Sequence, residues 1–77
     1  MEKLAFMLET LRQLQQAAER PDLSTLFDAM LDSVVHTAPE VMDLCWHRVF
    51  RFCMKHLHDR EDVQKIYNER IEQYFKL

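Results

Sequence analysis

The chain contains no glycine, and only two prolines and two cysteines, in 77 residues. Average usage would place about five glycines in this length. Tight hairpins, phosphate-binding loops and nucleophile elbows depend on glycine, because glycine adopts positive φ without a steric cost. The absence argues against most glycine-dependent enzyme motifs and most all-β folds, and it leaves a small all-α protein as the expected class.

Long apolar runs and a large excess of one charge are also missing. Apolar residues make up 48% of the chain, charged residues make up 30%, and the formal net charge is −3. No apolar run approaches the roughly 18 residues of a membrane span, and the N-terminus lacks the cationic start of a signal peptide. The negative charge gives no overall attraction to nucleic acid or anionic lipid. We therefore expect no membrane partner.

The two cysteines, Cys45 and Cys53, fall eight residues apart within one predicted helix. At the rise of an α-helix they would lie about 12 Å apart, which is too far for a disulfide. Free thiols suit a reducing compartment, so the sequence predicts a cytoplasmic location.

The spacing of the apolar residues predicts four amphipathic helices. The expected ranges are Glu2 to Glu19, Leu23 to His36, Thr37 to about Leu57, and Asp59–Glu61 to almost the end of the chain. Pro21 ends the first helix. Capping boxes are predicted at Thr25 with Asp28, where Asp22 or Ser24 could cap instead, and at Thr37 with Glu40.

Short links between these helices favour antiparallel neighbours. We therefore expect residues 1–77 to form a single domain, a compact up-and-down bundle of four short helices. Apolar positions cover about 180° of the 37–57 helix, which predicts that this helix is central. The alternative is a three-helix core with one helix projecting to a partner. Such short bundles have little stability to spare, which favours a homodimer or a hetero-complex.

Several residues do not fit the pattern of their own helix. Phe6 falls on the polar side of the first helix, and Leu44 and Met54 fall in the polar arc of the third. Aromatic residues, methionine and arginine are enriched at protein interfaces. The candidate interface residues are Phe6, Leu44, Phe50, Met54, Arg70, Ile71 and Phe75.

Arg70 lies in the middle of the apolar face of the last helix. A buried arginine needs a partner, since an unpaired interior charge is strongly disfavoured. Stacking on Trp46 or pairing with Asp28 or Asp32 would satisfy it, as would extension of the side chain to the rim of the core. Arg70 is also a candidate polar anchor for an acidic partner protein.

No acidic residue occurs between Asp43 and Asp59, a stretch that carries several basic side chains. The candidate nucleic-acid contacts are His47, Arg48, Arg51, Lys55 and His58. A helix-turn-helix would use the second and third helices, but Glu40 and Asp43 lie where base contacts belong, and the turn has no glycine. A solvated polar face is the simpler interpretation.

Cys53 and His56 are the one local pair of nucleophile and base. At a spacing of three on a helix, both would point into the same core, with no cleft for a substrate. They could also form half of a zinc site, but the spacing of a complete site is absent. We therefore expect no enzyme activity, no metal and no cofactor.

The sequence as a whole predicts a non-enzymatic protein-interaction module, such as an adaptor, an inhibitor, an immunity-type protein or a chaperone-like factor. The alternative is a nucleic-acid-binding regulator that uses the basic face of the third helix.

Overall fold

The first helix packs through one apolar side. The computed structural model describes residues 2–77, and α1 spans Glu2–Ala18. Its buried positions lie on one side of the helix and are Met7, Thr10, Leu11, Leu14 and Ala18. Four of the five match the apolar spacing that defines this helix in the sequence, and the fifth is a threonine.

Three further helices follow after short links. α2 spans Ser24–Val35, α3 spans Met42–His56, and α4 spans Glu61–Tyr74. A 3-10 turn precedes α2 at Pro21–Leu23, and another precedes α3 at Pro39–Val41. The predicted four helices are confirmed with boundaries shifted by a few residues, and residues 2–77 contain no strand.

The predicted capping boxes at Thr25 and Thr37 are wrong. Each proline begins a 3-10 turn, with Arg20 and Ala38 at the N-caps of the turns and Leu23 and Val41 at the N-caps of α2 and α3. None of these residues provides a side-chain cap. The Thr37 hydroxyl instead donates a hydrogen bond to the carbonyl of Ser33, at 2.6 Å. A proline in the first position has no N–H to satisfy, which reduces the need for a cap.

The C-terminus of α1 is held by a residue far away in the sequence. Glu19 adopts a left-handed φ of 49°, at the place where helices usually carry glycine. Arg60 donates to the carbonyls of Ala18 at 2.7 Å and Ala17 at 2.9 Å, and it also pairs with the carboxylate of Asp62. Arg60 therefore connects the end of α1 to the start of α4, which no sequence pattern had indicated.

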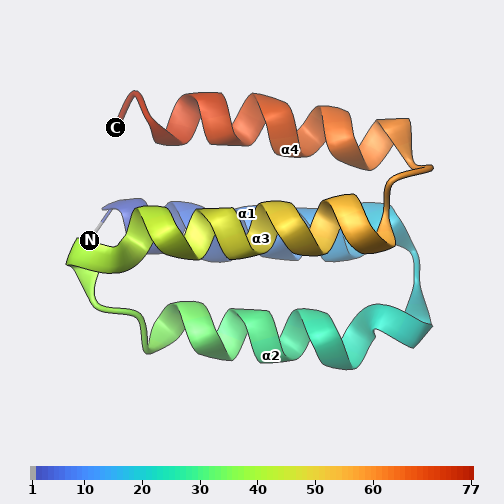
Figure 1. The fold of residues 1–77 in the computed structure, drawn as a ribbon, viewed down its shortest axis with the longest axis horizontal. Helices are drawn as coiled ribbons and strands as arrows, with labels where there is room; N and C mark the ends of the chain where they lie inside the picture. Colours follow the sequence, from blue (N-terminus) through green and yellow to red (C-terminus); the bar gives the residue numbers. More distant parts are fainter. Residues whose placement is uncertain (1) are drawn as a thin grey trace.

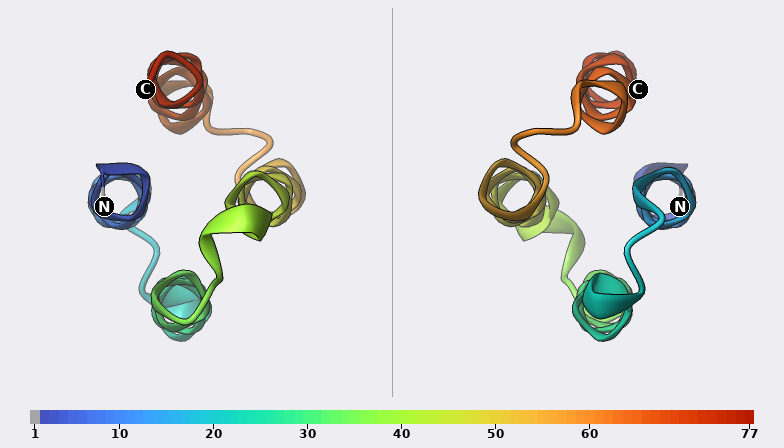
Figure 2. Two further views of the ribbon diagram at one scale, coloured as in Figure 1. Left: turned by 90° about the vertical axis from the view of Figure 1, so that its left-hand side faces the viewer. Right: turned by 90° about the vertical axis from the view of Figure 1, so that its right-hand side faces the viewer.

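The four helices run alternately up and down beside one another (Figure 1). Viewed end-on, they stand at the corners of a diamond, with α1 facing α3 across the middle and α2 and α4 at the far corners (Figure 2). The radius of gyration of 11.6 Å is that of a compact chain, for which about 11.5 Å is expected. The four-helix bundle is confirmed, and the three-helix core with a projecting helix is wrong.

Aromatic side chains from α3 and α4 fill the centre of the core. Trp46 packs edge-to-face against Tyr67 and Tyr74, with ring centroids 5.8 and 5.1 Å apart. On the other side, Phe27 of α2 meets Phe52 of α3 at 5.0 Å. α3 thus supplies the largest core side chain, as expected of a central helix, but it stands at a corner like the other three (Figure 2).

The two buried tyrosines differ in what their hydroxyl groups contact. Tyr74 donates a hydrogen bond of 2.8 Å to the Asp43 carboxylate, and burial together with this carboxylate raises the pKa of Tyr74. The Tyr67 hydroxyl is buried without a hydrogen-bond partner among residues 2–77, and burial raises the pKa of Tyr67. The hydroxyl group of Tyr74 therefore has a hydrogen-bond partner, and that of Tyr67 has none among residues 2–77.

We predict opposite effects on stability when each tyrosine is changed to phenylalanine. Tyr74→Phe loses the hydrogen bond to Asp43 and should lower the free energy of unfolding by about 1 kcal/mol. Tyr67→Phe removes an unpaired buried hydroxyl and should leave the free energy unchanged or raise it by up to about 1 kcal/mol. Urea unfolding followed by circular dichroism measures both. Equal losses would show that a buried water satisfies Tyr67.

We also predict that Glu19→Gly stabilises the bundle by about 0.5–1 kcal/mol, because glycine adopts the left-handed conformation without strain. Glu19→Gln is the matched control, since it removes the charge and keeps the strain. Gln16→Gly, at an exposed position inside α1, should instead cost about 1 kcal/mol. Thermal unfolding of the three variants measures this, and a glycine variant no more stable than the glutamine variant contradicts it.

Candidate functional site

The surface of α3 carries three of the seven candidate interface residues. Leu44, Phe50 and Met54 are 54%, 43% and 45% exposed, although the same helix also buries a full apolar side. Phe75, just after α4, is 61% exposed and packs its ring against Tyr74. These four side chains lie on the surface of the bundle.

Phe50 and Met54 form an apolar edge on the side of α3 that faces α4. The Phe50 ring lies 5.6 Å from the ring of Tyr67, and Met54 follows Phe50 by one helical turn. Ile71 follows Tyr67 by one turn on α4 and is half-buried against the core. The structure thus brings three of the predicted residues to the junction between α3 and α4.

Arg70 and Phe6 contact each other inside the bundle. The Arg70 guanidinium lies 3.8 Å from the centroid of the Phe6 ring and donates a hydrogen bond of 2.9 Å to the Thr10 hydroxyl. It also lies 3.7 Å from the Glu9 carboxylate, and its side chain is only 17% exposed. All these partners belong to α1.

The partners that we expected for Arg70 were therefore wrong. α2, which carries Asp28 and Asp32, stands at the opposite corner of the diamond from α4 (Figure 2). Trp46 packs against tyrosines of α4. The polar-side placement of Phe6 is also wrong, because α4 packs onto that side of α1 and covers it.

The basic face of α3 is intact on the surface. His47, Arg48, Arg51, Lys55 and His58 are all exposed. Among residues 2–77, no carboxylate forms an ion pair with any of them. α2 and α3 run antiparallel beside each other (Figure 1), whereas the helices of a helix-turn-helix cross at a steep angle. The cations are available, but the helix-turn-helix geometry is absent from this pair.

A groove of about 230 Å³ runs between α2 and α3. Its lining is almost entirely apolar, with one cation at the edge, and consists of Leu26, Ala29, Met30, Ser33, Val34, Cys45, Arg48, Val49 and Phe52. A second hollow continues it toward the α2–α3 link, where Cys45 and Arg48 line both. We call this continuous feature the α2–α3 groove.

Small side chains leave the α2–α3 groove open. Ala29 and Ser33 of α2 and Cys45 of α3 line it, and none of them is long enough to fill the space between two helices. The buried side chains of Val34 and Val49 also line it. Sequence periodicity did not reveal this groove, because alanine and serine on a helix surface give no hydrophobic signal.

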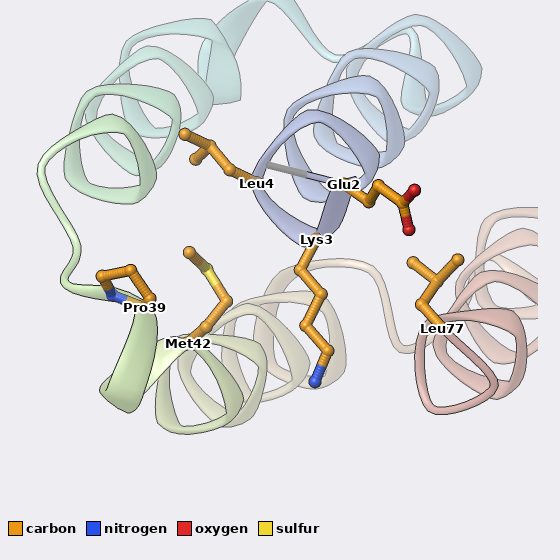
Figure 3. A pocket seen from close by; sticks show the side chains of 6 residues that line it. All are labelled: Glu2, Lys3, Leu4, Pro39, Met42 and Leu77. Carbon is orange, nitrogen blue, oxygen red and sulfur yellow. The ribbon is translucent and has the colours of Figure 1, made fainter.

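A further pocket of about 290 Å³ opens at the end of the bundle where the chain ends meet. Figure 3 shows Leu4, Pro39 and Met42 on one side of Lys3, with Glu2 and Leu77 on the other. Lys3 lies 3.9 Å from the Asp43 carboxylate and 4.9 Å from the ring of Tyr74. The Lys3 ammonium therefore contacts two residues that do not line the pocket.

Cys53 and His56 do not form a reactive pair. Cys53 is only 2% exposed, and burial raises its pKa to about 11. The His56 ring packs against Phe52, with centroids 4.9 Å apart. Within residues 2–77, no three side chains of histidine, cysteine, aspartate or glutamate come together as metal ligands would.

We predict that native Cys53 reacts with a thiol reagent at pH 8 about a hundredfold more slowly than in urea, since raising the pKa from 9.0 to about 11 lowers the thiolate fraction by about that factor. A Cys45→Ala background isolates this thiol. Rapid labelling of the folded protein contradicts the assignment.

The same pKa shift predicts how stability depends on alkaline pH. The thiol titrates near 9.0 when unfolded and near 11 when folded, so the folded state retains a proton that the unfolded state loses. The resulting stability is present below pH 9 and is lost as the pH rises toward 11. Cys53→Ala should flatten this part of the profile, and the two tyrosines should still contribute above pH 10.

No protein-family model matches this chain, and no curated protein or solved structure matches it either. Among the described residues, no helix combines the length and apolar character needed to cross a membrane. The interpretation of function therefore depends on the surfaces described above.

Proposed function

We propose that this chain is a small non-enzymatic protein-interaction module that works as an adaptor, an inhibitor, an immunity-type protein or a chaperone-like factor. The observation that carries the proposal is the surplus apolar surface of α3. Leu44, Phe50 and Met54 remain about half exposed although the core is already complete without them. Burying such side chains in a partner is the main source of affinity at protein interfaces.

The charged residues around this surface would set the orientation of the partner. Arg48, Arg51 and Lys55 are exposed along α3 beside the apolar edges. Charges at the rim of an interface contribute more to the association rate and to the choice of partner than to the affinity. Arg70 does not belong to this group, because its guanidinium already contacts Thr10 and Phe6 of α1.

A second candidate function is nucleic-acid binding through the basic face of α3. Three exposed cations, Arg48, Arg51 and Lys55, and two exposed histidines, His47 and His58, have no ion-pair partners among residues 2–77 and favour it. The net charge of −3 and the antiparallel arrangement of α2 and α3 (Figure 1) favour the protein partner instead.

The proposal includes a cytoplasmic location and an assembly of more than one chain. Both cysteines are buried free thiols, which suits a reducing compartment. A bundle of this size gains stability when it associates, whether with a second copy or with another protein.

Site-specific photo-crosslinking tests the proposed function. A photoreactive phenylalanine at position 44, 50 or 54 should yield protein adducts in the native cytoplasm, because these side chains would be buried against a partner. Positions 25 and 69 are the matched controls, since Thr25 and Glu69 are exposed on other faces and should yield few adducts. Mass spectrometry of the adducts distinguishes a second copy from another protein.

Equal adduct yields at the α3 and control positions contradict the proposal. Adducts formed with nucleic acid alone from all three α3 positions also contradict it and support the second candidate function.

A further inference from the structure

The α2–α3 groove combines an open apolar floor with a basic edge. Met30 and Val34 of α2 and Val49 of α3 lie along the groove, and Arg48 stands at its edge. Arg51 and Lys55 do not line the groove, but they follow Arg48 by three and seven residues on the same side of α3 and are exposed. This combination of an apolar floor and one positive edge is typical of a surface that binds a partner.

The other edge of the groove does not neutralise these cations. Asp28 and Asp32, the acidic residues of α2, do not line the groove. Asp32 instead lies 3.6 Å from His36 on its own side of the bundle. Among residues 2–77, Arg48, Arg51 and Lys55 have no ion-pair partner. The positive charge beside the groove is therefore unmatched.

From this we infer that the α2–α3 groove binds an amphipathic helix of another protein, with apolar side chains that enter the groove and acidic side chains that meet Arg48, Arg51 and Lys55. The inference rests on the proposed function, that this chain binds proteins, and it specifies the chemistry of the partner. Charge complementarity selects this occupant, since a basic helix would be repelled by the same edge.

The dimensions of the groove fit two turns of a guest helix. The lining residues of α2 extend from Leu26 to Val34, which corresponds to about 12 Å along the helix. A guest helix would place two or three apolar residues on that length, at spacings of three and four. A groove of about 230 Å³ takes side chains of the guest and leaves its backbone outside.

A pair of synthetic peptides tests the inference on the full chain. Both are capped helical peptides of about 15 residues with the same leucine positions, and the flanking residues are glutamate in one and lysine in the other. Fluorescence anisotropy should show that the glutamate peptide binds at least about tenfold more tightly, and that its affinity falls as salt is added. Equal affinities, or no binding of either peptide, overturn the inference.

Charge-reversal variants test whether the cations beside the groove attract the glutamate peptide. The double variant R48E/R51E should weaken binding of the glutamate peptide at least about tenfold and strengthen binding of the lysine peptide. R12E/K65E changes the total charge equally at exposed positions of α1 and α4 and should have little effect. Equal weakening by both double variants overturns the inference, because it shows general attraction without a site.

Filling the groove with a large side chain tests whether the peptide binds inside it. Ala29→Trp places a large side chain in the groove and should abolish binding, whereas Ala5→Trp at an exposed alanine of α1 should not. Unchanged helicity in circular dichroism shows that both variants fold. Undiminished peptide binding in Ala29→Trp overturns the inference.

The outcomes separate this inference from the proposed function. If crosslinking at positions 44, 50 and 54 captures a partner but Ala29→Trp leaves capture and peptide binding unchanged, the chain binds proteins through another surface and only the inference fails. If light scattering shows a dimer that Ala29→Trp converts to a monomer, a second copy occupies the groove and the choice of occupant is wrong.

Discussion

A helix at the corner of a four-helix bundle can bury only the part of its surface that faces the other three. This constraint determines which apolar side chains of the bundle are buried and which are exposed. α1 and α4 can bury their apolar stripes at a corner position, because the stripes are narrow and outward positions such as Glu9 and Glu69 are polar. α3 cannot, because its apolar residues cover about 180°, more than a corner position can bury. Phe50 is exposed at the margin of this arc, and Leu44 and Met54, which lie outside it, add further exposed apolar surface.

The two edges of α3 differ because the side chains on them differ in size. Toward α4, the large rings of Trp46, Tyr67 and Tyr74 fill the space between the helices. Toward α2, small residues such as Ala29 and Cys45 leave part of it empty. One edge therefore presents apolar side chains that project outward, and the other presents a groove. A partner that contacts α3 meets different shapes on its two sides.

The sequence was sufficient to predict the fold class and the positions of all four helices, because periodicity and the two prolines act locally. The sequence could not predict which helices face each other. For this reason the surroundings of Phe6 and the partners of Arg70 were predicted wrongly. Phe6 was assigned to a polar side since the packing of α4 on α1 is not encoded in the pattern of α1 alone. Thr10 and Arg70 form a pair 60 residues apart, and Arg60 reaches carbonyls 42 and 43 residues away. The basic face of α3 was found because it lies within one helix, whereas the groove beside it depends on two.

The net charge of −3 is a poor guide to what approaches this molecule. The bundle measures 31 by 24 by 17 Å, whereas salt at physiological strength screens charges beyond about 8 Å. A partner near α3 therefore responds to Arg48, Arg51 and Lys55 and not to the exposed acidic residues of α4 on the neighbouring corner. The exposed face of α4 carries Glu61, Asp62, Glu69 and Glu72, so α4 of a second copy would also be attracted to the cations of α3. The fit of apolar side chains in the groove would then decide between occupants that electrostatic attraction alone does not distinguish.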